Sequence, residues 1–175
     1  MPERVVPERL SWAVGRLQLS PGDDVLEIGC GRGVALALIC AQLDTGSVTG
    51  VDRSAAAIGG ARQRNRAAVD AGQLELIVAS FEKADYGGRS FDRILAVNVN
   101  HFWVRSATRE VELLKKLLAS DGQMHLVWEP PSRSKADQIA ETVGPLVAQS
   151  GLDVSVETSQ TTTGAALVAV VGTRR

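Results

Sequence analysis

Three closely spaced glycines are the clearest chemical signal in the sequence. Gly29, Gly31 and Gly33 form a G-x-G-x-G turn after a short apolar run and before an apolar helical stretch. Glycine lets a backbone turn sharply and approach a ligand with no side chain in between. A carboxylate two residues earlier, Glu27, does not help a loop to hold phosphate, but it would attract an ammonium or sulfonium group. The turn therefore predicts a cleft for a ligand that carries a positive charge.

The spacing of this turn argues against two common nucleotide sites. A dinucleotide fingerprint would require a third glycine at position 34, which is Val34. A Walker loop would require Gly-Lys followed by Ser or Thr, and the sequence has none after the turn. A nicotinamide oxidoreductase on a related sheet is therefore disfavoured.

Two further polar residues follow apolar runs. Asp52 ends the second run, where a carboxylate can accept hydrogen bonds from the two hydroxyls of a ribose. His101 is one of only two histidines and follows the fourth run. There it could act as a general base near neutral pH, or it could be a loop histidine that bonds to backbone.

The elements that must position these residues alternate along the chain. Short apolar runs alternate with helix-period stretches, which is typical of a parallel sheet covered on both faces. The last two runs are separated by only six residues, so they should pair as an antiparallel hairpin. The strands are expected at 23–29, 47–52, 74–80, 91–99, 123–128, 152–158 and 165–172, and the helices at 8–19, 34–43, 55–71, 108–118 and 136–150. This is a doubly wound, mostly parallel α/β sheet of seven strands.

Length and composition predict one globular domain over residues 1–175, with an N-terminal helix and turn at 1–22 and a core at 23–175. Net charge is −1, which argues against a nucleic-acid partner. No apolar run reaches the roughly 20 residues of a membrane span, and the polar N-terminus does not resemble a signal peptide. We expect a cytoplasmic protein without a membrane partner. The two cysteines and two histidines show no metal-ligand spacing, so no metal site is expected.

Taken together, these features resemble the class I methyltransferases that use S-adenosylmethionine, with the Rossmann-like methyltransferase fold. The resemblance runs through the whole chain. Ala79, Ser80 and Phe81 stand where the family often has Gly-Asp-Ala, and Asn98-Val99-Asn100-His101-Phe102 is similar to its Asn-x-x-His-His region. The Ser120-Asp121-Gly122 turn and the terminal hairpin also match the family pattern.

The resemblance implies a cofactor site. Glu27 and the backbone of Gly29, Cys30, Gly31 and Gly33 would hold the methionine end of S-adenosyl-L-methionine.

Asp52 would hold the ribose in that site, and Arg53 would flank the adenine. Ser80 stands in place of the family's acid, and the neighbouring backbone N–H of Phe81 could still reach the adenine ring. Glu82 could replace the missing acid.

Several roles stay open at this point. Cys30 is either a small buried spacer or a nucleophile, and Asn98 is either a strand-end cap or a contact to the methionine moiety. Trp103 and Trp128 could line a substrate pocket or cover the sheet, and Glu129 could contact the substrate. His125 should be structural.

The implied activity is in-line transfer of a methyl group to a nucleophilic atom of a small-molecule acceptor. The alternatives are a non-catalytic cofactor-binding or scaffold protein with this fold, and methylation of a protein or RNA. No lid domain is apparent, so the site could be open or covered by a second subunit of a homodimer.

Overall fold

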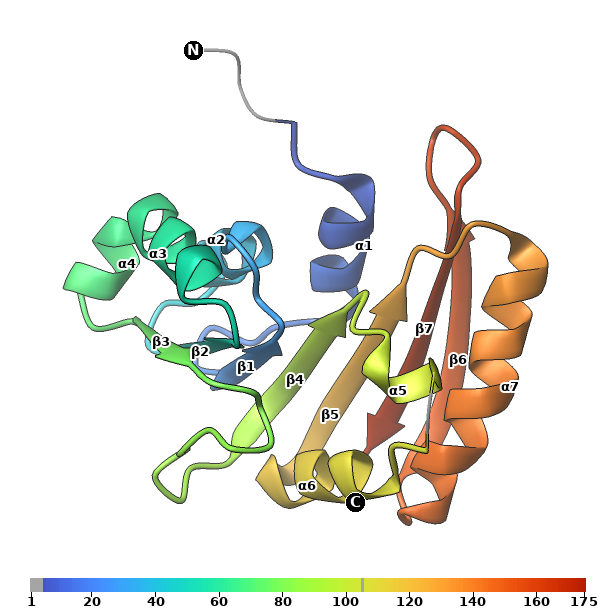
Figure 1. The fold of residues 1–175 in the computed structure, drawn as a ribbon. Helices are drawn as coiled ribbons and strands as arrows, with labels where there is room; N and C mark the ends of the chain where they lie inside the picture. Colours follow the sequence, from blue (N-terminus) through green and yellow to red (C-terminus); the bar gives the residue numbers. More distant parts are fainter. Residues whose placement is uncertain (1–4, 105) are drawn as a thin grey trace.

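A computed structural model describes residues 5–104 and 106–175 as a seven-stranded sheet flanked by helices (Figure 1). The strand order is β3-β2-β1-β4-β5-β7-β6. Strands β1 to β5 run parallel, and β7 lies antiparallel between β5 and β6. The strands are β1 (Val25–Ile28), β2 (Val48–Asp52), β3 (Leu74–Val78), β4 (Phe91–Val97), β5 (Leu118–Trp128), β6 (Asp153–Gln160) and β7 (Ala166–Thr173). The predicted mostly parallel sheet with a terminal antiparallel hairpin is confirmed.

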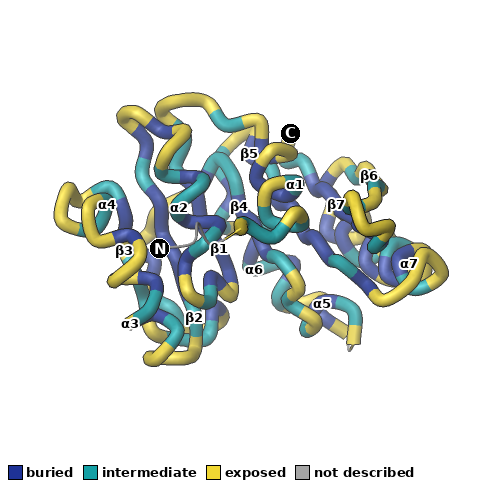
Figure 2. Tube along the Cα trace, turned by 90° about the horizontal axis from the view of Figure 1, so that it is seen from above, coloured by how far each residue is buried: buried dark blue, intermediate teal, exposed yellow. Residues whose placement is uncertain are grey.

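Helices cover both faces of the sheet. One face packs against α1 (Glu8–Arg16), α2 (Val34–Cys40), α3 (Ala55–Arg64) and α4 (Arg66–Asp70). The other face packs against α5 (His101–Val104), α6 (Thr108–Leu117) and α7 (Arg133–Gln149). Seen from above, the buried positions follow the sheet between these layers, and many exposed positions lie on the outer turns (Figure 2). Within the described residues, no helix combines the length and the apolar character that crossing a membrane requires.

The helix predicted at 55–71 is interrupted in the structure. Asn65 separates α3 from α4 and has non-helical backbone angles of φ −107° and ψ 27°. Its buried side-chain amide donates hydrogen bonds to the carbonyl oxygens of Gly33 (2.9 Å) and Ala61 (3.0 Å). The two hydrogen bonds of Asn65 therefore connect the end of α3 to the glycine turn.

Other boundaries also differ from the sequence prediction, among them three with a visible cause or consequence. The first helix ends at Arg16, because Gln18 has a left-handed φ of 48° that an α-helix does not continue. β5 begins at Leu118 rather than 123, and the predicted 120–122 turn lies inside this strand. Its register with β4 shifts near Phe91, and Asp121 has a φ of 61°. The helix predicted at 34–43 ends at Cys40.

The order of the strands places a crevice at one edge of the sheet. The chain passes from β1 outward to β2 and β3, and then returns to the other side of β1 with β4. In open α/β sheets, ligands bind at such a reversal, beyond the carboxyl ends of the strands. A cavity of about 460 Å³ lies there and is lined by residues that follow β1, β2, β3 and β4.

Candidate functional site

The glycine turn has the backbone that its sequence predicts. Gly29, Gly31 and Gly33 have φ values of 67°, 52° and 75°, which side-chain-bearing residues rarely adopt. Gly33 is the N-cap of α2, and a Cβ atom added there would lie 2.5 Å from the Asn65 amide nitrogen. Glycine is therefore needed where the chain turns from β1 into α2, and it leaves the backbone of this turn uncovered by side chains.

Asp52 lies at the end of β2 beside this turn. Its Oδ2 accepts a hydrogen bond from the backbone N–H of Gly31, and its Oδ1 accepts one from the N–H of Ser54, both at 2.9 Å. The side chain also lines the 460 Å³ cavity. The carboxylate is thus fixed by backbone groups at the wall where the sequence predicts a ribose.

Glu27 is a buried carboxyl group at the bottom of the site. Only 3% of the residue is exposed, and Oε2 has no hydrogen-bond partner among the described residues. Burial, with the charge of Asp52 as the second cause, raises its pKa to about 8. A backbone hydrogen bond from Leu36 opposes this rise only in part, so the buried carboxylate remains costly, and a cation in front of it would relieve that cost. The side chain lines a second cavity of about 250 Å³ next to the start of α1. The carboxyl group therefore offers hydrogen-bond acceptors that fit the ammonium group of a methionine moiety.

The structure brings the predicted site residues into one cleft. The 460 Å³ and 250 Å³ cavities share Gly29 and Asn98. The larger is lined by Gly29, Asp52, Arg53, Ser80, Phe81, Asn98 and His101, and the smaller by Glu27, Gly29, Cys30, Gly31 and Asn98. Gly33 lines neither of the two, and its part is to shape the turn.

Asn98 acts as a strand-end cap. It has a φ of 55°, and its side-chain Oδ1 accepts a hydrogen bond of 2.9 Å from the backbone N–H of Glu129. This bond ties the end of β4 to the end of β5. The contact of Asn98 with a methionine moiety stays a prediction.

Cys30 has the environment of a spacer. The residue is 5% exposed, and burial raises the pKa of its thiol well above the usual range. A thiol that keeps its proton is a poor nucleophile. His125 lies in β5, is 2% exposed and lines neither part of the cleft, which fits its predicted structural role.

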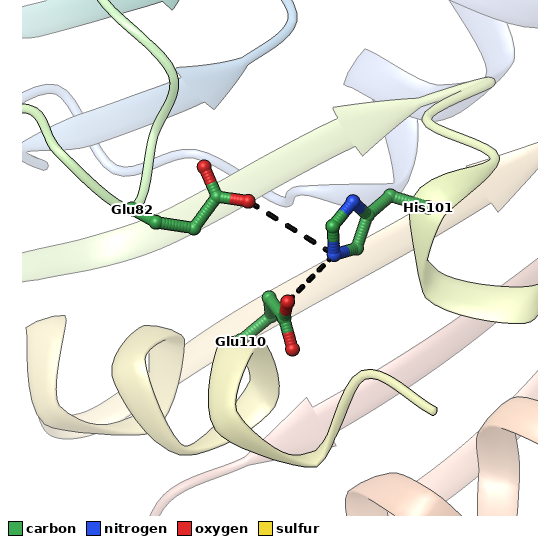
Figure 3. Close-up of side chains that lie close together, drawn as sticks. All are labelled: Glu82, His101 and Glu110. Carbon is green, nitrogen blue, oxygen red and sulfur yellow. Dashed lines mark hydrogen bonds and ion pairs between the residues drawn. The ribbon is translucent and has the colours of Figure 1, made fainter. Parts of the chain in front are cut away.

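His101 begins α5, a short helix that the sequence did not predict. Its Nε2 lies 2.7 Å from Oε1 of Glu110 and 3.9 Å from Oε1 of Glu82 (Figure 3). The ring packs edge-on against Phe81 and Phe102, with centroids 6.0 Å apart in each pair. Glu82 lines the cavity as a replacement acid would, but its carboxylate faces His101.

Sequence reasoning did not identify Glu110. An acid in the first turn of an amphipathic helix is common, because it interacts favourably with the helix dipole. Only the contact with His101, which the fold creates between the first turn of α6 and the start of α5, distinguishes Glu110 from the other acids among the described residues.

A further cavity of about 290 Å³ adjoins the cleft and shares Asn98 and Asn100 with it. Trp103, Trp128 and Lys135 are among its lining residues. The Lys135 ammonium lies 4.3 Å from the centroid of the Trp103 ring. The buried indole N–H of Trp128 has no hydrogen-bond partner in the described part of the chain.

Comparison with known proteins identifies the family. Residues 25–122, more than half of the chain, match the family model described as "Methyltransferase domain". An O-methyltransferase of Pyrenophora dematioidea is 35% identical over 91 residues, which are 51% of this chain and 34% of that protein. Ribosomal protein L11 methyltransferase of Burkholderia thailandensis is 38% identical over 82 residues, 41% of this chain and 26% of that protein. The chain spans about a quarter to a third of the length of the curated relatives that it matches.

Solved structures show the same fold at low identity. Precorrin-6y C5,15-methyltransferase of Geobacter metallireducens is 14% identical and has a TM-score of 0.74, covering 99% of this chain and 92% of that one. Magnesium protoporphyrin IX methyltransferase of Synechocystis, solved with bound S-adenosylmethionine, is 16% identical with a TM-score of 0.69, covering 95% and 76%. The family match, the sheet order and the cleft agree, and the chain belongs to the methyltransferase-domain family.

Proposed function

We propose that this chain binds S-adenosyl-L-methionine across the cleft and methylates a small-molecule acceptor. The observation that carries the proposal is the buried carboxyl group of Glu27, whose Oε2 lacks a partner in the described structure. It lines the cavity beside the glycine turn, where an ammonium group would complete its interactions.

The other cleft residues support the same ligand. Asp52 offers the remaining lone pairs of its carboxylate to ribose hydroxyls. Arg53, Ser80 and the backbone of Phe81 border the part of the cavity that would receive adenine. When bound, this cofactor supplies a methyl group activated by a sulfonium centre. The chain's own task is to hold the acceptor in line with that group and to exclude water.

The 290 Å³ cavity is the proposed acceptor site. It joins the cleft at Asn98 and Asn100, at the end of β4, so its contents would meet the cofactor there. The indole rings of Trp103 and Trp128 favour a planar or apolar group. Its volume favours a small molecule over a macromolecular segment. The role of His101 as a general base stays a prediction, since only an acceptor that is protonated at the working pH needs one.

Calorimetry with S-adenosylmethionine and with its demethylated thioether tests the binding step. We expect both to bind and Glu27→Gln to weaken both. No heat with either compound at millimolar concentration would contradict the proposal.

A panel of small acceptors, scored by mass spectrometry for the methylated product, tests the reaction. Trp128→Phe should raise the KM for an acceptor and leave cofactor affinity unchanged, whereas Trp12→Phe on α1 should change neither. Cofactor binding without turnover on any small acceptor, protein or RNA would favour a non-catalytic protein. Turnover only on a protein or RNA would assign the acceptor to that class.

A further inference from the structure

We propose that Glu82, His101 and Glu110 form a binding site for one divalent transition-metal ion such as Zn²⁺. Nothing in the sequence pattern indicated it, because the three residues lie on separate segments. Among the residues that the structure describes, one ligand atom from each lies within 4.8 Å of the other two. The site goes beyond the proposed methyl transfer and does not depend on it.

The geometry of the three side chains suits a small cation. They reach one point from the loop after β3, from the first residue of α5 and from the first turn of α6 (Figure 3). In a tetrahedral site with bonds of about 2.0–2.1 Å, ligand atoms lie about 3.3 Å apart. The distances from His101 Nε2 to the carboxylate oxygens of Glu110 and Glu82 are 2.7 Å and 3.9 Å, on either side of that value. Small side-chain adjustments would therefore place all three atoms around one ion.

The ligand chemistry selects the class of ion. One imidazole nitrogen and two carboxylate oxygens suit Zn²⁺ and its first-row neighbours, whereas Mg²⁺ and Ca²⁺ favour oxygen alone. The cluster is partly shielded and still open to solvent. The exposed fractions of the side chains are 20% for His101, 15% for Glu110 and 33% for Glu82.

The residues around His101 restrict the orientation of its imidazole ring. The Phe81 and Phe102 rings pack on the imidazole and fix its plane, which reduces the ordering needed when an ion binds. Three protein ligands leave one tetrahedral position open. Glu82 and His101 also line the 460 Å³ cavity, so the proposed ion would lie near the wall of the cleft. An ion on Nε2 would give His101 a ligand role in place of a base role.

Metal titration of chelator-treated protein without cofactor tests the site. We expect calorimetry to show one Zn²⁺ per chain, and Co²⁺ to give the visible absorption bands of a tetrahedral site. His101→Ala and Glu82→Gln should each weaken Zn²⁺ binding at least ~10-fold. Glu112→Gln, on the same helix as Glu110, is the matched control and should bind as the wild type does. Glu82 is the most exposed of the three, so Glu82→Gln should leave the fold unchanged, which circular dichroism can verify.

Two results would overturn the site. One is no Zn²⁺ binding by the wild-type chain, which would leave the cluster as a hydrogen-bonded His–Glu pair. The other is binding of equal strength in His101→Ala and Glu82→Gln, which would place the ion elsewhere. Because the titration uses no cofactor, its failure is separate from a failure of the proposed methyl transfer.

Discussion

The carboxylate of Asp52 accepts a hydrogen bond of 2.9 Å from the backbone N–H of Gly31 and so joins the end of β2 to the glycine turn. The other carboxylate oxygen accepts a hydrogen bond from the backbone N–H of Ser54, the residue just before α3. A strand-end acid that faces a cleft thus supports two neighbouring backbone segments. The residue has one structural role and one proposed binding role, and substitutions can separate them.

Replacing Asp52 should affect both roles to different extents. Asp52→Ala removes acceptors for ribose hydroxyls, and hydrogen bonds to charged groups are worth about 1.5–3 kcal/mol. The cofactor dissociation constant should therefore rise roughly 10- to 150-fold in calorimetry. Asp52→Asn keeps one acceptor oxygen and should lose less thermal stability than Asp52→Ala. Asp70→Asn, which removes an exposed charge paired with Arg66, is the control. An unchanged dissociation constant in Asp52→Ala would mean that the ribose is held elsewhere.

Two glycines of the turn should respond differently to alanine. Gly31 has a φ of 52° but open space around its missing Cβ, so Gly31→Ala should cost about 1–2 kcal/mol of unfolding free energy. At Gly33 a Cβ would lie 2.5 Å from the Asn65 amide and 2.9 Å from the Cβ of Ala61. Gly33→Ala should therefore destabilise the protein more than Gly31→Ala in urea unfolding. Equal losses of unfolding free energy in the two variants would show that α3 can move away from the added Cβ without strain.

The features that could be predicted from the sequence are those set by neighbouring residues. The alternation of apolar runs with helical stretches determines the sheet, and the G-x-G-x-G turn with its preceding acid lies within seven residues. By contrast, the break at Asn65 depends on a bond to Gly33 O, across two elements. The His101–Glu110 contact depends on how the fold brings the start of α5 to the first turn of α6. Such contacts leave no local signal, because the same residue types occur on ordinary helix surfaces.

His125 should make stability depend on pH. Burial is the main cause that lowers its pKa from 6.5 to about 4, with the charge of Arg93 as the second. The unfolded chain then binds a proton between pH 6.5 and 4 that the folded chain does not. Stability is complete above pH 6.5 and falls as the pH drops toward 4, by about 3 kcal/mol in total.

Urea unfolding at pH 7 and pH 4.5 checks this dependence. His125→Leu removes the titrating group and its buried Nδ1, which has no partner among the described residues, so the difference in stability between the two pH values should shrink relative to wild type. Carboxylates that titrate in this range are common to both proteins and cancel in the comparison. If the unfolding free energy changes equally between pH 7 and pH 4.5 in both proteins, the buried imidazole does not cause the loss of stability in acid.

Cofactor binding should release a proton from Glu27. With a pKa near 8, this carboxyl group is mostly protonated at pH 7 in the ligand-free protein. An ammonium group in front of it favours the ionised form, so binding should expel close to one proton. At pH 9.5 Glu27 has already ionised and releases no proton, and the ligand's own amino group, which is largely neutral at that pH, should instead take one up. Calorimetry in two buffers of different ionisation enthalpy gives the number of protons released.

Two controls assign that proton to Glu27 and to the methionine end of the ligand. Glu27→Gln should bind S-adenosylmethionine about 1.5–3 kcal/mol more weakly and release no proton at pH 7. Adenosine carries no ammonium group and should bind the wild-type chain without proton release. The raised pKa also means that the unfolded chain releases this proton near pH 4.5 and the folded chain near pH 8, so Glu27 lowers the stability of the ligand-free protein as the pH rises from 4.5 to 8. Glu27→Gln should then unfold at a higher temperature than the wild type at pH 9. Proton release that persists in Glu27→Gln would place the titrating group elsewhere and remove the main support for an ammonium ligand in the cleft.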